Sequence, residues 1–169
     1  MEFKDFILDE FDRVKRATTR VLDGLTFQEI MWRPGPETNS IGVILFHTIR
    51  SEDSFINARA QGKPQVWDSG KWFEKVGLPQ TDTGNYTREQ LAKFACPQIA
   101  DLMAYADAVR AQTLQYIAGL TPDMFDKTVN VGRIGDISIG RVFSLVLIHA
   151  AQHTGEISYI RGVQRGLNG

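Results

Sequence analysis

Apolar side chains recur at intervals of three and four residues through most of this chain, and that period favours helices over strands. The first stripe reads Phe3, Phe6, Ile7, Phe11, Val14, Thr18, Val21 and Leu25. Three further stretches keep a helical period, and none shows the alternation of a convincing long strand. Long amphipathic helices bury their stripes against one another, so the sequence predicts an all-α fold, a four-helix bundle.

Local signals predict where these helices begin and end. Gly24 is expected to end the first helix, because glycine readily adopts the backbone conformation that follows a helix. Ser40 is the expected N-cap of the second helix, which should run to about Ala60. Thr87 opens a capping box, so the third helix should start at Arg88.

The remaining segments are expected to be less regular. A long loop, 61–86, should connect the second and third helices, since it is rich in glycine and proline. Pro97 should kink the third helix or open its first turns. The segment 127–138 is expected to form a small hairpin. Ser138 should then cap the final helix, which includes 139–163.

Length and charge restrict the class of protein. A chain of 169 residues suits one core, so we expect a single domain, 1–169. A net charge of −1 with scattered Lys and Arg argues against a nucleic-acid partner. No run approaches the roughly 18 apolar residues of a membrane span, and no apolar signal segment is present. One cysteine excludes an internal disulfide. These features together predict a cytoplasmic protein without a membrane partner.

Histidine occurs only three times, at His47, His149 and His153. His149 and His153 lie four apart on the final predicted helix, separated by about 40° around its axis and about 6 Å along it. His47 falls on the inward stripe of the second predicted helix. Each histidine could be a core imidazole satisfied by hydrogen bonds, and that alternative stays open. The pattern equally fits three imidazoles that hold one metal ion.

The type of ligand restricts which metal ions could bind and which reactions they could support. Neutral imidazoles suit Zn, Ni, Cu, Co or Fe(II) and disfavour Mg or Ca. Three protein ligands leave a position for water or substrate, which is the arrangement of catalytic rather than structural zinc. Such an ion acidifies a bound water or thiol. Ala150 stands where a zincin metalloprotease has its general-base glutamate, so that class is disfavoured.

Four other residues are candidates for supporting the site or contacting substrate. Glu156 shares the face of the histidine pair, so it could hydrogen-bond an imidazole, act as a fourth ligand or pair with a surface Arg. Arg50 could bind an anionic substrate or a thiol carboxylate, or it could be salt-bridged or solvated. Trp67 and Trp72 lie in the long loop, where aromatic residues either cover a substrate or pack.

Simpler structural roles are expected elsewhere. Glu52 and Asp53 should form a solvated edge of the second helix. Cys96 has no histidine close in sequence, so we expect a small buried hydrophobic residue rather than a nucleophile. Gly155 and Gly162 lower the stability of a helix relative to alanine, and they indicate close helix contact, for example in a homodimer.

Two segments carry a resemblance to a known family. They read LTFQEIMWRPGPETNSIGVILFHTIRSEDSF and, far downstream, LIHAAQHTGEISYIRG. In these segments the chain resembles the DinB-like (YfiT-like) superfamily. The matching features are the W-R-P-G-P turn, the N-S-I-G that follows it, the histidine of the second helix and the terminal H-x-x-x-H-T-G-E. The resemblance covers essentially the whole chain. It implies a bundle of unusual helix order and a divalent metal, often Ni or Zn, held by His47, His149 and His153.

The resemblance also implies a class of activity. Some members of this superfamily are S-transferases or isomerases that use a low-molecular-weight thiol as cosubstrate. We therefore expect a metal- and thiol-dependent enzyme that acts on a small electrophilic molecule. The alternatives are a non-catalytic metal-binding bundle, serving as a sensor, stress-response or structural protein, and a metal-dependent hydrolase. An open coordination position beside a cavity would favour an enzyme, whereas a site closed by Glu156 would favour a non-catalytic protein.

Overall fold

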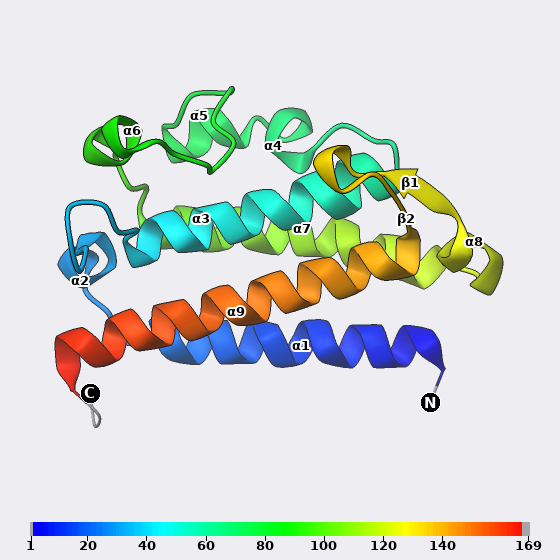
Figure 1. Ribbon diagram of the computed structural model, residues 1–169, viewed down its shortest axis with the longest axis horizontal. Coiled ribbons are helices and arrows are strands. Elements are labelled where there is room, and N and C mark those ends of the chain that lie inside the picture. Colours follow the sequence, from blue (N-terminus) through cyan, green and yellow to red (C-terminus); the bar gives the residue numbers. More distant parts are fainter. Residues whose placement is uncertain (1, 167–169) are drawn as a thin grey trace.

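Four long helical segments form the body of the protein. The computed structural model describes residues 2–166, and Figure 1 shows these segments side by side along the longest axis. They are α1 (Phe3–Leu22), α3 (Ile41–Glu52) with its continuation η1 (Asp53–Ala60), α7 (Ile99–Gly119) and α9 (Ile139–Arg165). Both α1 and α3 pack against α7 and α9. The prediction of an all-α fold is confirmed.

The first helix follows directly from its apolar stripe. α1 buries Ile7 and Phe11, while its charged residues lie on the other side. The chain leaves this helix at Gly24, which adopts a φ of +68° that favours glycine. A short helix, α2 (Phe27–Met31), comes next and begins with a capping box at Thr26.

The second long helix begins where the sequence predicted but changes character along its length. The hydroxyl oxygen of Ser40 accepts a hydrogen bond from the backbone N–H of Val43 at 3.3 Å. The helix is α-helical through Glu52 and π-helical from Asp53 to Ala60. A period of three and four residues does not reveal such a widened turn, and π-helical turns are frequent at functional sites.

The prediction that Glu52 lies on a solvated edge is wrong, because its side chain is buried. One carboxylate oxygen accepts hydrogen bonds from Nε of Arg110 at 2.9 Å and from the Thr113 hydroxyl at 2.8 Å. The other accepts from Nη2 of Arg110 at 2.8 Å. A buried carboxylate is tolerated when it is paired and hydrogen-bonded, and here both partners come from α7.

The same prediction is wrong for Asp53, which is fully buried. Its Oδ1 accepts from the backbone N–H of Val66 at 2.8 Å, and its Oδ2 accepts from the N–H of Trp67 at 2.9 Å. The hydroxyl of Tyr105 also donates to Oδ2, at 2.7 Å. Asp53 therefore satisfies the first backbone N–H groups of α4 (Val66–Ser69) and links that helix to α3 and α7.

The long connection after η1 is more ordered than its composition suggests. It contains α4, then α5 (Trp72–Val76), and ends at α6 (Arg88–Lys93), which starts at the predicted residue with the predicted capping box. The predicted loop, 61–86, thus holds two short helices that its glycine and proline content conceals. Trp67 of α4 is fully buried, so hydrophobic packing holds the connection against the bundle.

Pro97 separates two helices rather than kinking one. α6 ends at Lys93, and α7 does not begin until Ile99. Gln98, next to the proline, has a ψ of 141° and caps the new helix without a side-chain hydrogen bond. Proline has no N–H and its ring collides with the preceding turn, so a complete break is the outcome here.

A small hairpin precedes the last helix, as predicted. After α8 (Pro122–Asp126), strand β1 (Thr128–Asn130) pairs antiparallel with β2 (Asp136–Ser138), with Thr128 opposite Ser138. The 3-10 turn η2 (Gly132–Ile134) connects the two strands. The Ser138 hydroxyl accepts from the third backbone N–H of α9, which confirms the predicted cap.

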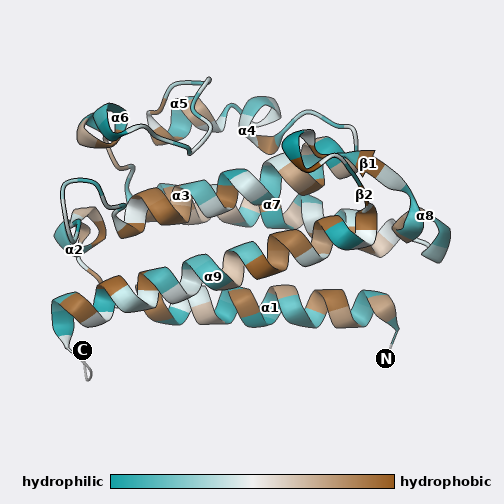
Figure 2. Ribbon diagram, in the orientation of Figure 1, coloured by the Kyte–Doolittle hydropathy of each residue, from teal (hydrophilic) through white to brown (hydrophobic). Residues whose placement is uncertain are grey.

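Two groups of apolar side chains form the core. One gathers around Phe46, Trp67 and Tyr105, and the other around Phe11 and Phe143. Figure 2 shows hydrophobic and hydrophilic residues alternating around the long helices, as amphipathic helices require. Within residues 2–166, no helix combines the length and the apolar character needed to cross a lipid bilayer.

Two predictions concern the cysteine and the glycines of the last helix. Cys96 is buried, as expected, and desolvation raises the pKa of its thiol to about 11. Gly155 and Gly162 make no close contact with another helix inside the described chain, since a Cβ on either would meet no atom within 4 Å beyond the adjacent residues and backbone of α9 itself. The homodimer expected at these glycines stays a prediction.

Candidate metal centre and its cleft

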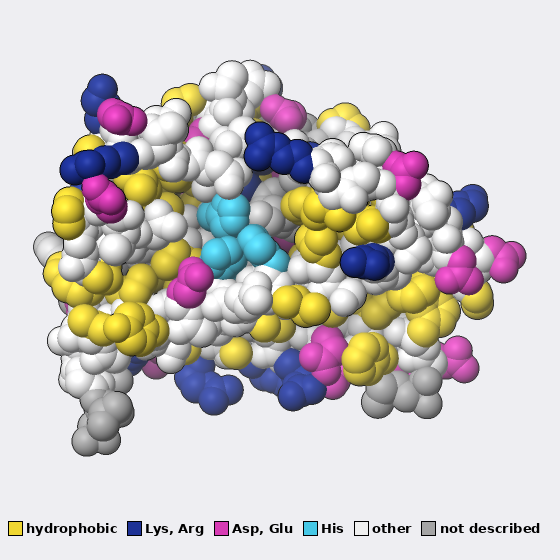
Figure 3. All heavy atoms as spheres, in the orientation of Figure 1, with side chains coloured by type: hydrophobic (Ala, Val, Ile, Leu, Met, Phe, Trp, Pro, Cys, Tyr) yellow, Lys and Arg dark blue, Asp and Glu magenta, His cyan; other side chains and the backbone are white. Residues whose placement is uncertain are grey.

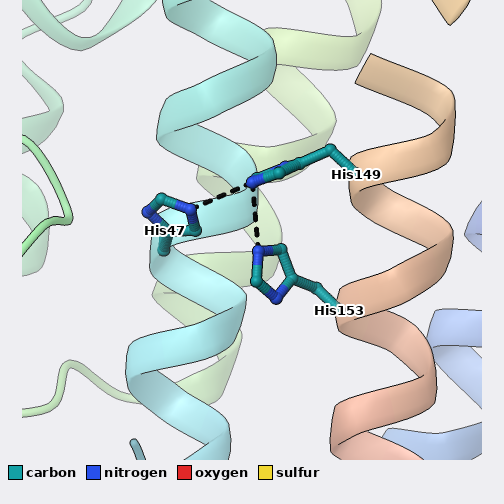
Figure 4. Close-up of side chains that lie close together, drawn as sticks. All are labelled: His47, His149 and His153. Carbon is teal, nitrogen blue, oxygen red and sulfur yellow. Dashed lines mark hydrogen bonds between the residues drawn. The ribbon is translucent and has the colours of Figure 1, made fainter. Parts of the chain in front are cut away.

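Three imidazoles from two helices point toward one another (Figure 4). His47 projects from α3, and His149 and His153 project from successive turns of α9. Nε2 of His149 lies 3.1 Å from Nε2 of His47 and 3.0 Å from Nε2 of His153. The packing of α3 against α9 thus brings together residues that are 102 positions apart in the chain.

The outward nitrogen of two imidazoles is held by an acceptor. Nδ1 of His47 donates to the carbonyl oxygen of Gly84 at 3.1 Å, and Nδ1 of His153 donates to Oε2 of Glu156 at 2.7 Å. Since a carbonyl or an ionised carboxylate oxygen only accepts, each Nδ1 carries the proton and each Nε2 presents a lone pair toward His149. Outer acceptors of this kind orient metal-binding histidines.

Burial favours the uncharged form of two of these imidazoles. Desolvation, with a smaller contribution from His153 and His47, lowers the pKa of His149 to about 4. Desolvation also lowers the pKa of His47, again with a contribution from His153. Both rings are therefore neutral near pH 7, which is the form that binds a metal ion.

This set of donors fits a divalent transition-metal ion. Three nitrogens about 2.1 Å from one ion lie roughly 3.0–3.4 Å apart, depending on the coordination geometry. The two Nε2 separations at His149, 3.0 and 3.1 Å, fall in that range. Neutral imidazoles are ligands of Zn²⁺ and Ni²⁺ rather than of Mg²⁺ or Ca²⁺. His47, His149 and His153 are therefore the residues that could hold such an ion.

A cleft of about 920 Å³ opens beside the imidazoles and is lined by His47 and His149. Figure 3 shows the histidines within this hollow on the face of the molecule. Its apolar wall includes Phe55, Leu145 and Ile148, and its polar lining comes from α3, η1, Gln65, α9 and the loop 83–85. A cleft of this size and mixed polarity suits a small organic molecule.

Arg50 lines the cleft, but its guanidinium is already engaged. Nη1 donates to the Tyr105 hydroxyl at 3.1 Å, and Nε donates to the backbone carbonyl of Asp82 at 3.2 Å. The same guanidinium lies 4.5 Å from the centre of the Trp67 ring. Trp67 supports Arg50 from below, and Trp72 packs against Tyr105; neither tryptophan lines the cleft.

Gly84 contributes to the site although the sequence did not predict it. It has a φ of +75°, and a Cβ at this position would lie only 3.0 Å from Cα of His47. The Asp82 side chain accepts from the Gly84 N–H at 2.9 Å, which holds the turn that presents the carbonyl to His47. A backbone acceptor has no side-chain signature, and only the glycine-rich composition of this loop hinted at it.

Glu156 accepts a hydrogen bond from Nδ1 of His153. Replacing it therefore tests whether the hydrogen bonds to the outward nitrogens of the imidazoles support metal binding. Replacing Glu156 with alanine should lower Zn²⁺ affinity by about 10–100-fold, because the imidazole loses the partner that fixes its tautomer and orientation. The side chain is half-exposed, so the free energy of unfolding should change little. Competition with a chromophoric chelator at pH 7 measures the affinity.

Two further variants complete that test. Glu156→Gln keeps an acceptor oxygen without the charge, so its affinity should fall between those of the parent and the alanine variant. Glu74→Ala removes an exposed acid outside the cleft and should leave the affinity unchanged. Equal affinities in Glu156→Ala and Glu74→Ala would contradict a role for Glu156.

Comparisons with known proteins place the chain among its relatives. Residues 10–157 match the family model described as the DinB superfamily. Among solved structures, the crystal structure of a conserved protein from Enterococcus faecalis aligns with a TM-score of 0.84 and 23% identity, covering 96% of this chain and 97% of that chain. At that identity the likeness describes the fold alone. A comparison with curated proteins found no match.

Proposed function

We propose that this chain, which belongs to the DinB superfamily, is a metal- and thiol-dependent S-transferase that acts on a small electrophilic molecule. The observation that carries the proposal is the meeting of three Nε2 atoms at the edge of a large cleft. His47, His149 and His153 hold one divalent ion in this proposal, Zn²⁺ or Ni²⁺. The outer contacts to Gly84 and Glu156 support it, because they leave the Nε2 lone pairs available.

The residues of the chain have separate tasks in the proposed reaction. When bound, the ion supplies positive charge that lowers the pKa of a thiol placed beside it. Gly84 and Glu156 keep two imidazoles in the required tautomer. Phe55 and Ile148 offer apolar surface for the acceptor molecule. A carbon–sulfur bond then forms between thiol and acceptor as the bond to the leaving group breaks, and the thiol proton passes to solvent.

The composition of the cleft favours thiol transfer over hydrolysis. Among the described residues that line it, none is aspartate or glutamate, so no carboxylate faces the cleft to serve as a general base for water. Glu156 is hydrogen-bonded to Nδ1 of His153 instead. A thiol needs less help than water, since it loses its proton far more easily.

The size of the cleft favours an enzyme over a non-catalytic metal-binding protein. A structural zinc site is commonly closed by four protein ligands. Here Glu156 binds an imidazole and does not close the site, and about 920 Å³ lies beside His47 and His149. A metal-binding sensor, stress-response or structural protein is therefore the second candidate.

The test of the proposed function combines metal analysis with a transfer assay on protein purified without a histidine tag. We expect about one divalent ion per chain by mass spectrometry of the elements. Protein loaded with Zn²⁺ or Ni²⁺ should then conjugate at least one of several low-molecular-weight thiols to a monochlorobimane-type acceptor, with fluorescence as the readout. Chelator-stripped protein should lose the activity and recover it on reloading.

The two measurements separate the parts of the proposal. Metal at about one ion per chain without turnover on any thiol would overturn the transferase assignment and favour the non-catalytic candidate. Absence of a bound ion in protein exposed to Zn²⁺ and to Ni²⁺ would overturn the metal site itself.

A further inference from the structure

Arginine side chains gather along the cleft, and in the part of the chain that the structure describes only that of Arg50 has a carboxylate nearby, Asp53 at 3.6 Å. Three arginines line it, Arg50 from α3, Arg59 from η1 and Arg141 from α9. No aspartate or glutamate is found among the described lining residues. Figure 3 shows Lys or Arg side chains at the borders of the hollow that holds the histidines. A water-filled cleft lined by one sign of charge concentrates ligands of the opposite sign.

Two of these arginines differ from the third because their guanidinium groups make no hydrogen bond to any described residue of the protein. Arg50 already donates to Tyr105 and to the Asp82 carbonyl. By contrast, within residues 2–166 the guanidinium groups of Arg59 and Arg141 make no ion pair and no hydrogen bond. Each guanidinium offers five N–H donors in a planar fork that matches a carboxylate or a phosphate.

Arg59 is exposed, and its contacts with the protein leave its hydrogen-bond donors available. Its guanidinium carbon lies 5.1 Å from the centre of the Phe55 ring. The hairpin turn is also close, since a Cβ on Gly132 would lie 2.7 Å from Nη1 of Arg59. The absence of a side chain at Gly132 therefore makes room for this guanidinium.

Arg141 approaches from the other wall and lies in line with the histidines. Positions 141, 144, 145, 148, 149 and 152 of α9 all line the cleft, which is the spacing of one helical face. Arg141 precedes His149 by eight residues, or about 12 Å along the axis. The charged end of the cleft and the imidazoles are thus separated by the length of a small organic molecule.

A further polar group in the same cleft lacks a partner. Oε1 of Gln65 is buried and receives no hydrogen bond, the one such side-chain atom in residues 2–166. Gln65 also lines the cleft. Its amide can present either oxygen or NH₂ by a half-turn, so it can complete its hydrogen bonding with a polar or anionic ligand. Buried polar groups without partners are rare, so this atom is expected to hydrogen-bond a water or a ligand in the cleft.

We propose that Arg59 and Arg141 bind the acidic head group of a small organic ligand whose other end reaches the three histidines. The head group is a carboxylate or a phosphate. Both are anions that accept two hydrogen bonds from one guanidinium group. This site rests on the proposed function in one respect, the identity of the bound molecule. If the protein is a thiol transferase, then either the thiol or its acceptor is an anionic molecule. Arg59 and Arg141 are positioning and specificity residues in this proposal.

Binding of simple anions to metal-free protein tests the head-group site separately from any metal chemistry. The probes are succinate, inorganic phosphate and the neutral analogue succinamide, each titrated calorimetrically into chelator-treated protein. Succinate or phosphate should bind, succinamide should bind at least about tenfold more weakly, and the affinity should fall as salt is raised. The tighter of the two anions identifies a carboxylate or a phosphate head group.

Matched charge variants identify the residues. Arg59→Gln combined with Arg141→Gln should weaken anion binding about tenfold or more, and lysine at both positions should restore part of it. Arg13→Gln combined with Arg16→Gln makes the same change of net charge on exposed α1 and should bind as the parent does. Failure of the parent to bind either anion, or equal affinity in the two glutamine variants, would overturn the proposal.

A histidine variant distinguishes this inference from the proposed function. His149→Ala removes a donor of the candidate metal site and should still bind the preferred anion with the parent's affinity, because the head group lies about 12 Å away along α9. Loss of anion binding in His149→Ala would place the anion at the histidines and contradict the arginine site. A protein that binds the anion but no metal would leave the arginine site standing and the metal site refuted.

Discussion

Replacing His149 with alanine is expected to abolish metal binding, which is the largest functional effect that the structure predicts. Nε2 of His149 is the central donor, 3.1 Å from Nε2 of His47 and 3.0 Å from Nε2 of His153. Its loss leaves two imidazoles on different helices. The fall in affinity should exceed the 10–100-fold that is typical for losing an outer contact to a ligand. Elemental mass spectrometry of the untagged variant should find almost none of the metal that the parent binds.

The control for this experiment lies one turn away on the same helix. Gln152→Ala removes another residue that lines the cleft, yet offers no nitrogen to the cluster, so its metal content should match the parent's. His47→Ala and His153→Ala should lose the ion as His149→Ala does. A His149→Ala protein that keeps a full complement of metal would show that the ion binds elsewhere and would remove the basis of the proposed chemistry.

Replacing Asp53 with asparagine is expected to lower the free energy of unfolding by about 3–5 kcal/mol, the largest effect on stability that the structure predicts. The carboxylate is fully buried and accepts from the backbone N–H groups of Val66 and Trp67 and from the Tyr105 hydroxyl. Asparagine is nearly isosteric, but its NH₂ would face a donor, and Arg50 at 3.6 Å would lose its buried counter-charge. Denaturation by urea, followed by circular dichroism, measures the free energy of unfolding.

The same substitution has a local consequence that a general loss of stability would not produce. Asp53 links the start of α4 to the bundle. The substitution should therefore accelerate hydrogen exchange more at the backbone amides of 61–86 than at those of α1, when parent and variant are compared at equal free energy of unfolding. Asp9→Asn makes the same chemical change on the exposed side of α1 and should alter the unfolding free energy by about 0.5 kcal/mol or less. Indistinguishable stabilities of the two variants would refute the linking role of Asp53.

The histidine cluster could be anticipated because its members are rare and regularly spaced. Two histidines four apart on a helix must share a face, whatever packs against them. His47 needed only to lie on a face of α3 that meets α9, and an amphipathic pattern indicates such a face. Chemistry that depends on residue type and helical period can therefore be recognised from the sequence.

The buried charges could not be anticipated, because their partners are distant in the chain. Glu52 and Asp53 follow Arg50 in a charged run that resembles a solvated helix edge. Their burial depends on Arg110 and Tyr105, more than fifty positions away on α7. A local pattern contains no information on which helix supplies the counter-charge, and the π-helical turn from Asp53 onward changes which side chains face inward.

Several residues in and around the cleft could likewise not be recognised from the sequence. Arg59 and Arg141 appear in the sequence as ordinary charged residues, and Gly84 contributes only a backbone carbonyl. They come together because η1, α9 and the loop before α6 surround the same space. Trp67, in contrast, is conspicuous in the sequence for its size, and it is a core residue beneath Arg50.

The amino-acid sequence by itself determined the long helices, most of their caps, the hairpin, the family and the three histidines, because these depend on local hydrogen bonds, apolar period and residue chemistry. Only the tertiary structure decided which charges are buried, how the imidazoles are oriented and which arginines face the cleft. Those properties depend on the relative placement of α3, α7 and α9, and pairs of residues far apart in the chain acquire their energies only when the helices pack.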